Sequence, residues 1–325
     1  MKAQPITCTP KSLPRNRLVE AARVARDINP VNHPPVERLA QVMPGFTPRP
    51  LSIAVLTTKY WGAKGVKLTV GFLDGPPRDL RQRILEHMNA WAETANVAFT
   101  ESRSEPQVRI AREGGRDGGY WSYVGTDVRL IDPDQPTMNL EGFTMNTPES
   151  EFVRVVRHET GHTLGFPHEH MRKALVAKID RRKAIEYFMR TQGWTEQEVI
   201  RQVLTPLEEQ SLIGTSEPDP KSIMCYQIPG FLTKSGQPIL GGRDISALDS
   251  SFVATLYPRP TEAKPKTRPK RKVKGRPKRK TRPKSKVKAR PKTKAKAKTK
   301  AKAKTKARTS AKRKTARPRS AARKR

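Results

Sequence analysis

The chain has 325 residues, of which 66 are Lys or Arg and 30 are Asp or Glu, so that its formal net charge is +36. Its two cysteines, Cys8 and Cys225, are too few for a disulfide-built scaffold, and no bridge between them is predicted, although the sequence leaves one open. No apolar run reaches the roughly 18 residues of a membrane span. The start lacks the apolar core of a signal peptide, which favours a cytoplasmic location and leaves export without a cleaved signal open.

The positive charge is concentrated at one end of the chain. Residues 261–325 hold 33 of the Lys and Arg residues and a single acid, Glu262, so this segment carries +32 and the remainder only +4. We therefore predict three parts: residues 1–50 as an N-terminal extension, a candidate pro-segment; residues 51–260 as the folded domain; and residues 261–325 as a disordered tail.

Apolar periodicity predicts the elements of the folded part. A short helix is expected at 18–26, an alternating strand at 66–72 and a helix over 80–91. Four further strands are expected, at 97–100, 107–111, 119–124 and 137–143.

Capping residues delimit the later helices. Thr147 as N-cap and Pro148 at the first position predict a helix that runs to Leu164, with Gly165 ending it. Two helices follow, at 181–190 and at 196–204, the latter with a Thr195–Glu198 capping box, and the last is expected at 245–256.

A metal-binding pattern lies on the central helix. His158 and His162 are four residues apart and project from one face, and a turn at Gly165 would return the chain so that His168 supplies a third ligand. Three protein ligands leave a fourth position open, which is typical of catalytic zinc. Glu159, beside the pair, is suited to take a proton from the water that zinc activates.

A second motif, Ser222-Ile-Met-Cys-Tyr226, follows downstream. Together the motifs resemble the metzincin metallopeptidases and, among them, the astacin family. The resemblance, over about residues 60–258, implies an α+β domain: a twisted mixed sheet with two long helices and a small irregular lower part carrying a Met-turn. It implies one Zn²⁺ ion, Met224 as the floor of the site, and Tyr226 as a group that stabilises the oxyanion.

Other parts of the resemblance concern the substrate and latency. Glu169 matches a residue that anchors the mature N-terminus in astacins, and the region 137–143 is the expected edge strand for binding an extended peptide. The Phe-x-Gly-Asp motif of astacin proenzymes is absent from residues 1–60. Cys8 is an alternative zinc-capping thiolate, but its flanking residues do not match the matrixin switch, and the sequence disfavours it. His170 is expected to be an exposed residue rather than a supporting group.

The tail resembles those of linker histones. Its Lys residues alternate from Lys292 to Lys306, a period that builds no buried face. We expect nonspecific binding of nucleic acid or another polyanion through phosphate contacts; anionic surfaces or simple solubilisation are the alternatives.

Two functions are compatible with these features. The first is a zinc metalloendopeptidase that hydrolyses proteins or peptides, with Glu159 as general base. The alternative is a nucleic-acid-binding or nucleoid-associated protein that uses an inactive or latent protease fold as a scaffold. The intact Glu159 favours the enzyme, because a purely structural site would not require it.

Overall fold

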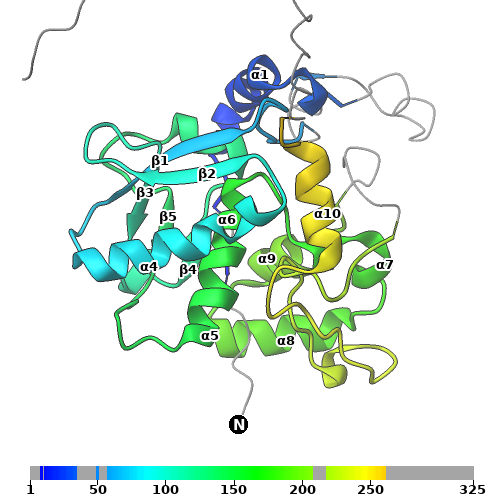
Figure 1. Cartoon of the computed structure of the whole chain (residues 1–325). Coiled ribbons are helices and arrows are strands. Elements are labelled where there is room, and N and C mark those ends of the chain that lie inside the picture. The colour runs from blue at the N-terminus through cyan, green and yellow to red at the C-terminus, as the bar shows by residue number, and fades with distance from the viewer. Residues whose placement is uncertain (1–7, 10, 35–48, 51–56, 208–216, 261–325) are drawn as a thin grey trace, which may run out of the picture. The chain divides into compact units, whose positions relative to one another are not determined.

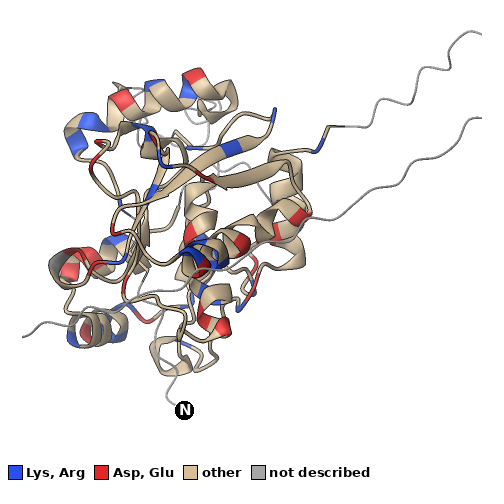
Figure 2. Ribbon diagram, turned by 60° about the vertical axis from the view of Figure 1, so that its left-hand side comes forward, with Lys and Arg blue, Asp and Glu red and all other residues tan. Residues whose placement is uncertain are grey.

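The computed structural model describes residues 8–9, 11–34, 49–50, 57–207 and 217–260 (Figure 1). These residues belong to the first of two units, Met1–Lys264, and the predicted tail at 261–325 lies outside them. Among the helices of this described part, none is long and apolar enough to cross a membrane. Figure 2 shows acidic and basic residues interspersed along the ribbon, as expected for a part of the chain with little net charge.

The predicted mixed sheet is confirmed and has five strands in the order β2-β1-β3-β5-β4. The pairs β1–β2, β1–β3 and β3–β5 are parallel, and β4 alone runs antiparallel to its neighbour β5. The strands are β1 (Val66–Phe72), β2 (Val97–Glu101), β3 (Val108–Ala111), β4 (Tyr120–Ser122) and β5 (Met138–Leu140).

The expected edge strand was wrong. We expected the edge near residues 137–143, but β5 lies inside the sheet, between β3 and β4, and all three of its residues are buried. The edge at this end is β4, which comes last in the strand order and, among the five strands, pairs only with β5; β2 is the edge at the other end. Any peptide that joins this end of the sheet must therefore pair with Tyr120–Ser122.

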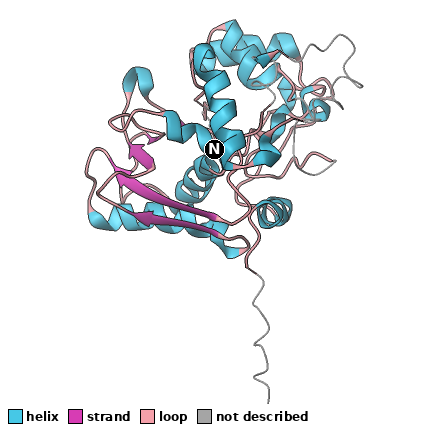
Figure 3. Ribbon diagram, turned by 90° about the horizontal axis from the view of Figure 1, so that it is seen from above, coloured by secondary structure: helices cyan, strands magenta, loops and turns pink. Residues whose placement is uncertain are grey.

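The predicted helices are present, with shifted ends. The helices are α1 (Leu18–Ile28), α4 (Arg78–Met88), α5 (Glu149–Glu151), α6 (Arg157–Thr163), α7 (Lys173–Val176), α8 (Arg181–Gln192), α9 (Glu196–Val199) and α10 (Ala247–Leu256). Of these, α7 was not predicted, and the single helix predicted from Thr147 to Leu164 is divided into α5, a π-helical stretch at Phe152–Val156 and α6. Figure 1 shows α6 in the middle, with the sheet and α4 on one side and α7 and α10 on the other. Figure 3 shows the strands gathered on one side of this part and helices over the rest of it.

Two caps differ from the prediction. Pro148 rather than Thr147 is the N-cap of α5, since the Thr147 hydroxyl accepts a hydrogen bond from the Thr144 amide instead. The last helix starts two residues later than predicted. Its N-cap is Ser246, which forms a capping box with Asp249, the third residue of the helix. The Thr195–Glu198 capping box is confirmed.

Two apolar clusters flank α6. One joins the sheet and α4, around residues such as Leu68, Ile84 and Trp91, to residues on either side of α6, among them Val156 and Leu164. The other joins α8 and α9 to residues 225–239 and includes Cys8 from the N-terminal extension. α6 therefore lies where the two clusters meet, which places its polar residues in a largely dry environment.

The close approach of two chain segments depends on Gly125. Its φ is +51°, and a Cβ there would lie 1.9 Å from the Lys59 carbonyl oxygen, whereas Gly142, with φ +66°, has nothing within 4 Å. We predict that Gly125→Ala destabilises the fold by about 4 kcal/mol or more, and that Gly142→Ala costs only about 1–2 kcal/mol. Thermal unfolding checks this, and equal losses for the two variants would contradict the crowding argument.

Candidate metal centre

The local structure of α6 brings three histidines together. His158 and His162 project one turn apart, with ring centroids 4.9 Å from one another. After the helix, Gly165 adopts a φ of +102°, which favours glycine, and turns the chain back as predicted. The Nε2 atom of His168 consequently lies 3.2 Å from that of His158 and 3.1 Å from that of His162.

Hydrogen bonds on the opposite ring nitrogens fix the tautomers of two histidines. Nδ1 of His158 lies 2.6 Å from the Ile223 carbonyl oxygen, and Nδ1 of His162 lies 2.7 Å from that of Phe166. A carbonyl can only accept, so both Nδ1 atoms carry the proton and both Nε2 lone pairs point into the cluster. Burial lowers the pKa of His158 to about 4 and those of His162 and His168 well below normal, so the rings are neutral.

A metal ion fits these donors. Tetrahedral zinc with Zn–N bonds of about 2.0–2.1 Å separates its nitrogen ligands by about 3.3 Å, close to the two distances observed. The protons of His158 and His162 are on Nδ1, so only Nε2 of His168 could carry one, and a single proton does not satisfy both facing lone pairs, whereas a cation accepts all three. Nδ1 of His168 has no hydrogen-bond partner among the described residues. The donor chemistry of the cluster therefore matches a zinc site.

The fourth member of the cluster is Cys8, which the sequence disfavoured. Its sulfur lies 3.4 Å from Nε2 of His162, and the candidate ligand atoms of Cys8 and the three histidines all lie within 4.8 Å of one another. Both cysteines are free thiols, so the open alternative of a Cys8–Cys225 bridge is not realised. Burial, followed by the charge of Glu159, raises the pKa of the Cys8 thiol well above normal. A cation among the imidazoles would reverse this and favour the thiolate.

Backbone pairing holds Cys8 at the cluster. Its segment pairs in parallel with the edge strand β4, through hydrogen bonds from the Thr9 amide to Tyr120 O (3.1 Å) and from the Lys11 amide to Ser122 O (3.1 Å). The segment then continues into α1. Beyond that helix, buried Asn32 donates to the carbonyls of Ala25 (2.8 Å) and Tyr60 (2.7 Å) and fastens the extension to the domain.

The predicted Met-turn lies beneath the histidines. Met224 is 3% exposed and packs against Gly161, where a Cβ would come within 2.4 Å of the Met224 sulfur. The turn is tied to α10 by Asp249, which accepts hydrogen bonds from the Ser222 hydroxyl (2.6 Å) and the Ile223 amide (2.9 Å). These contacts also orient the Ile223 carbonyl that fixes the His158 tautomer.

Glu159 and Tyr226 complete the polar lining. Glu159 is 1% exposed, and its Oε2 has no hydrogen-bond partner among the described residues. Burial raises the pKa of Glu159 to about 8, against smaller lowering effects of Cys8 and Arg154. The Tyr226 hydroxyl donates a short hydrogen bond to the Cys8 carbonyl. Burial raises the pKa of this phenol well above normal, so it is a donor and not an anion.

The residues after the third histidine differ from expectation. His170 was expected to be exposed, but it is fully buried, with its ring stacked on that of Tyr226. Its burial lowers its pKa to about 3. One oxygen of Glu169 accepts from the Asp219 amide (2.9 Å), and burial raises the pKa of Glu169 to about 7. The anchoring of a mature N-terminus by Glu169 stays a prediction.

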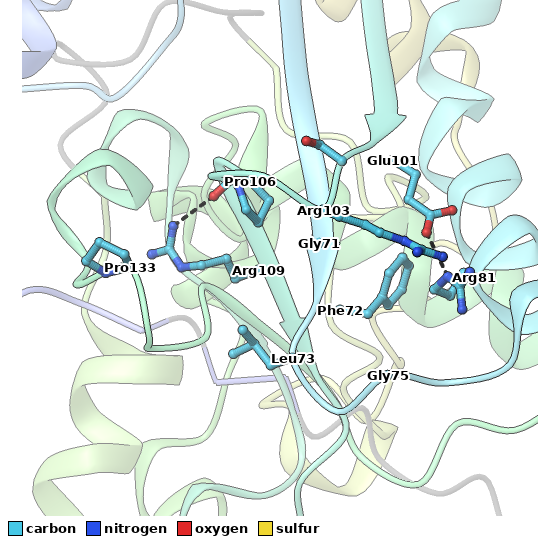
Figure 4. A pocket seen from close by; sticks show the side chains of 11 residues that line it. Gly71, Phe72, Leu73, Gly75, Arg81, Glu101, Arg103, Pro106, Arg109 and Pro133 are labelled. Atoms are coloured by element: carbon cyan, nitrogen blue, oxygen red, sulfur yellow. Dashed lines mark hydrogen bonds and ion pairs between the residues drawn. The ribbon is translucent and has the colours of Figure 1, made fainter.

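A hollow of about 440 Å³ lies elsewhere, at the ends of β1 and β2 (Figure 4). Three of the charged residues that line it have partners: Arg81 pairs with Glu101 at 2.8 Å, and Arg109 donates to the Pro106 carbonyl (3.2 Å) and to other carbonyls. None of the four cluster residues lines it. We assign it no catalytic role.

The sequence located the three histidines, Glu159, Met224 and Tyr226, which the structure brings together. It did not anticipate that Cys8 lies at the histidines, that His170 is buried against Tyr226, or which strand is the edge. A lone cysteine upstream of a zinc motif was the available signal, but no spacing rule connects two segments separated by 154 residues.

Comparison with known proteins agrees with this arrangement. A solved structure of myroilysin is 31% identical, with a TM-score of 0.57, over 62% of this chain and 96% of that one. Zinc metalloproteinase nas-27 of Caenorhabditis elegans is 39% identical over 97 residues, which are 30% of this chain and 20% of the relative, so the chain matches about a fifth of that protein's length. The model of the peptidase family Astacin matches residues 57–244, more than half of the chain. The chain belongs to the astacin family.

Proposed function

We propose that the chain is a zinc-dependent endopeptidase and that its N-terminal extension keeps it latent. The observation that carries the proposal is the buried cluster of three neutral histidines and one cysteine, beside which one oxygen of the Glu159 carboxylate has no hydrogen-bond partner among the described residues. Family membership and the name of the relative, a zinc metalloproteinase, support the choice of metal and reaction.

His158, His162 and His168 would hold the zinc ion. When bound, zinc would polarise the carbonyl of the bond to be cleaved and lower the pKa of an attacking water. Glu159 takes the proton from this water, for which its unpaired Oε2 is available, and later delivers it to the leaving amine. Tyr226 donates to the oxyanion, as its hydroxyl already donates to the Cys8 carbonyl.

The substrate would be an extended stretch of protein or peptide added to β4. The backbone groups of Tyr120 and Ser122 already pair with Thr9 and Lys11, so this edge can accept another strand. Because the extension uses the same edge and delivers Cys8 to the histidines, extension and substrate exclude one another. The link within one chain gives the thiol a high effective concentration at the site.

Metal ligation by Cys8 is tested by replacing zinc with cobalt(II). We expect the full chain to bind one metal ion and to show a thiolate-to-cobalt charge-transfer absorption in the near ultraviolet. Cys8→Ala should lose this absorption while it still binds the ion, and Cys225→Ala, the other buried cysteine, should keep it. A full chain without the absorption, or its loss only in Cys225→Ala, would refute ligation by Cys8.

Latency and catalysis are tested by hydrolysis of casein. We expect the full-length zinc protein to be nearly inactive and Cys8→Ala to be at least about 10-fold more active, because one strong ligand no longer competes with substrate. Adding Glu159→Gln to Cys8→Ala should lower kcat by about 10² or more while zinc stays bound. A double variant that keeps its activity would remove Glu159 from the mechanism.

We further propose that residues 261–325 bind nucleic acid or another polyanion. With +32 charges in this segment, binding should be driven by counterion release and should not depend on sequence. An enzyme anchored in this way would act near the polyanion.

The tail is tested by DNA binding at increasing salt. We expect the affinity of the full chain for duplex DNA to fall by about 10³ or more between about 50 and about 200 mM salt. Truncation after Pro260 should abolish binding. A variant with the same tail residues in shuffled order is the control and should bind normally. Binding that survives truncation would assign it to the folded part.

A further inference from the structure

We propose that His170 is a positioning residue for Tyr226: its ring is one wall of a slot that holds the phenol in the plane needed to reach a bound carbonyl. The inference rests on the proposed role of Tyr226 in catalysis.

The slot is made of two imidazoles. The Tyr226 ring lies between His168, at a centroid distance of 4.3 Å and an interplanar angle of 50°, and His170, at 4.1 Å and 10°. The nearly parallel face of His170 allows the phenol to slide within its own plane but resists tilting out of it. All three side chains are at most 2% exposed.

The His170 ring is itself anchored. Its Nε2 lies 3.0 Å from the Gln202 carbonyl oxygen, and since a carbonyl only accepts, Nε2 carries the proton. Gln202 lies in the π-helical stretch Ile200–Leu204 that follows α9. Carbonyls at the end of a helix lack partners within the helix. The anchor therefore connects the plane of the imidazole to a second element of the fold.

The other ring nitrogen, Nδ1, indicates that His170 does more than fill space in the core. Nδ1 is buried without a hydrogen-bond partner among the described residues, a cost that a phenylalanine of similar shape would avoid. What histidine adds over phenylalanine here is the bond to Gln202, which fixes the orientation of the ring. A fixed orientation of the His170 ring matters because the hydroxyl of the adjacent Tyr226 must reach one particular acceptor atom, as it reaches the Cys8 carbonyl.

The test is a double-mutant cycle in the full-length Cys8→Ala protein loaded with zinc. We expect His170→Ala to lower kcat by about 10-fold, the equivalent of one aromatic contact, and to change KM by less than about 2-fold. In a protein that also carries Tyr226→Phe, His170→Ala should lower kcat by less than about 2-fold, because the hydroxyl to be positioned is gone. His170→Phe, which keeps the wall without the anchor, should recover part of kcat, and His170→Asn should not.

His87→Ala is the matched control, since His87 is also buried and also stacks on an aromatic ring, that of Phe152, at 5.4 Å. His87→Ala should lower the stability of the protein, and any effect that it has on kcat should be the same with and without the Tyr226 hydroxyl. A loss of kcat from His170→Ala that is equally large with and without the Tyr226 hydroxyl would show a merely structural role and overturn the proposal.

A crystallographic readout is independent of turnover. In zinc-loaded His170→Ala we expect the Tyr226 ring in more than one orientation, with all three histidine ligands in place. A single, unchanged phenol would overturn the inference. If the Cys8→Ala parent is inactive, the proposed function fails. Whether the Tyr226 ring has one orientation or several in the crystal still decides the role of His170.

Discussion

Three neutral imidazoles whose lone pairs face one another in a dry interior are the constraint on which the rest of the structure depends. Hydrogen bonds within the cluster cannot satisfy all of them, because the proton of His158 and that of His162 are each committed to a carbonyl on the far side of the ring, which leaves at most the proton of His168. A bound cation would accept all three lone pairs. The glycine turn after α6, the Met-turn below it and Asp249 behind that turn all fix the positions or tautomers of these rings.

The N-terminal extension contacts the site in the way a peptide substrate would. It pairs its backbone with β4, presents a carbonyl to Tyr226 and places a side chain at the histidines. It contacts both the proposed metal ligands and the proposed oxyanion donor. Removing one of these contacts leaves the others, so under the proposed latency full activity requires the whole segment to leave the edge. Asn32 also ties the extension to the domain, through its hydrogen bond to the Tyr60 carbonyl.

The electrostatics of the chain divide between two regimes. In the folded part, burial determines ionisation: it keeps the histidines neutral, raises the pKa of Glu159 and keeps Tyr226 protonated. In residues 261–325 charge density dominates, and it bears on partners and location rather than on chemistry. The two regimes share no residues, so variants can separate the proposed peptide hydrolysis from the proposed polyanion binding.

The sequence by itself determined the local features. Helical spacing put His158 and His162 on one face, Gly165 fixed the turn to His168, and apolar alternation located β1, because each depends only on neighbours along the chain. Tertiary structure alone decided that β4 is the edge, that Cys8 reaches the histidines and that His170 stacks on Tyr226. The contact of Cys8 with His162 joins residues 154 positions apart, and no period or spacing in the sequence encodes which segments meet.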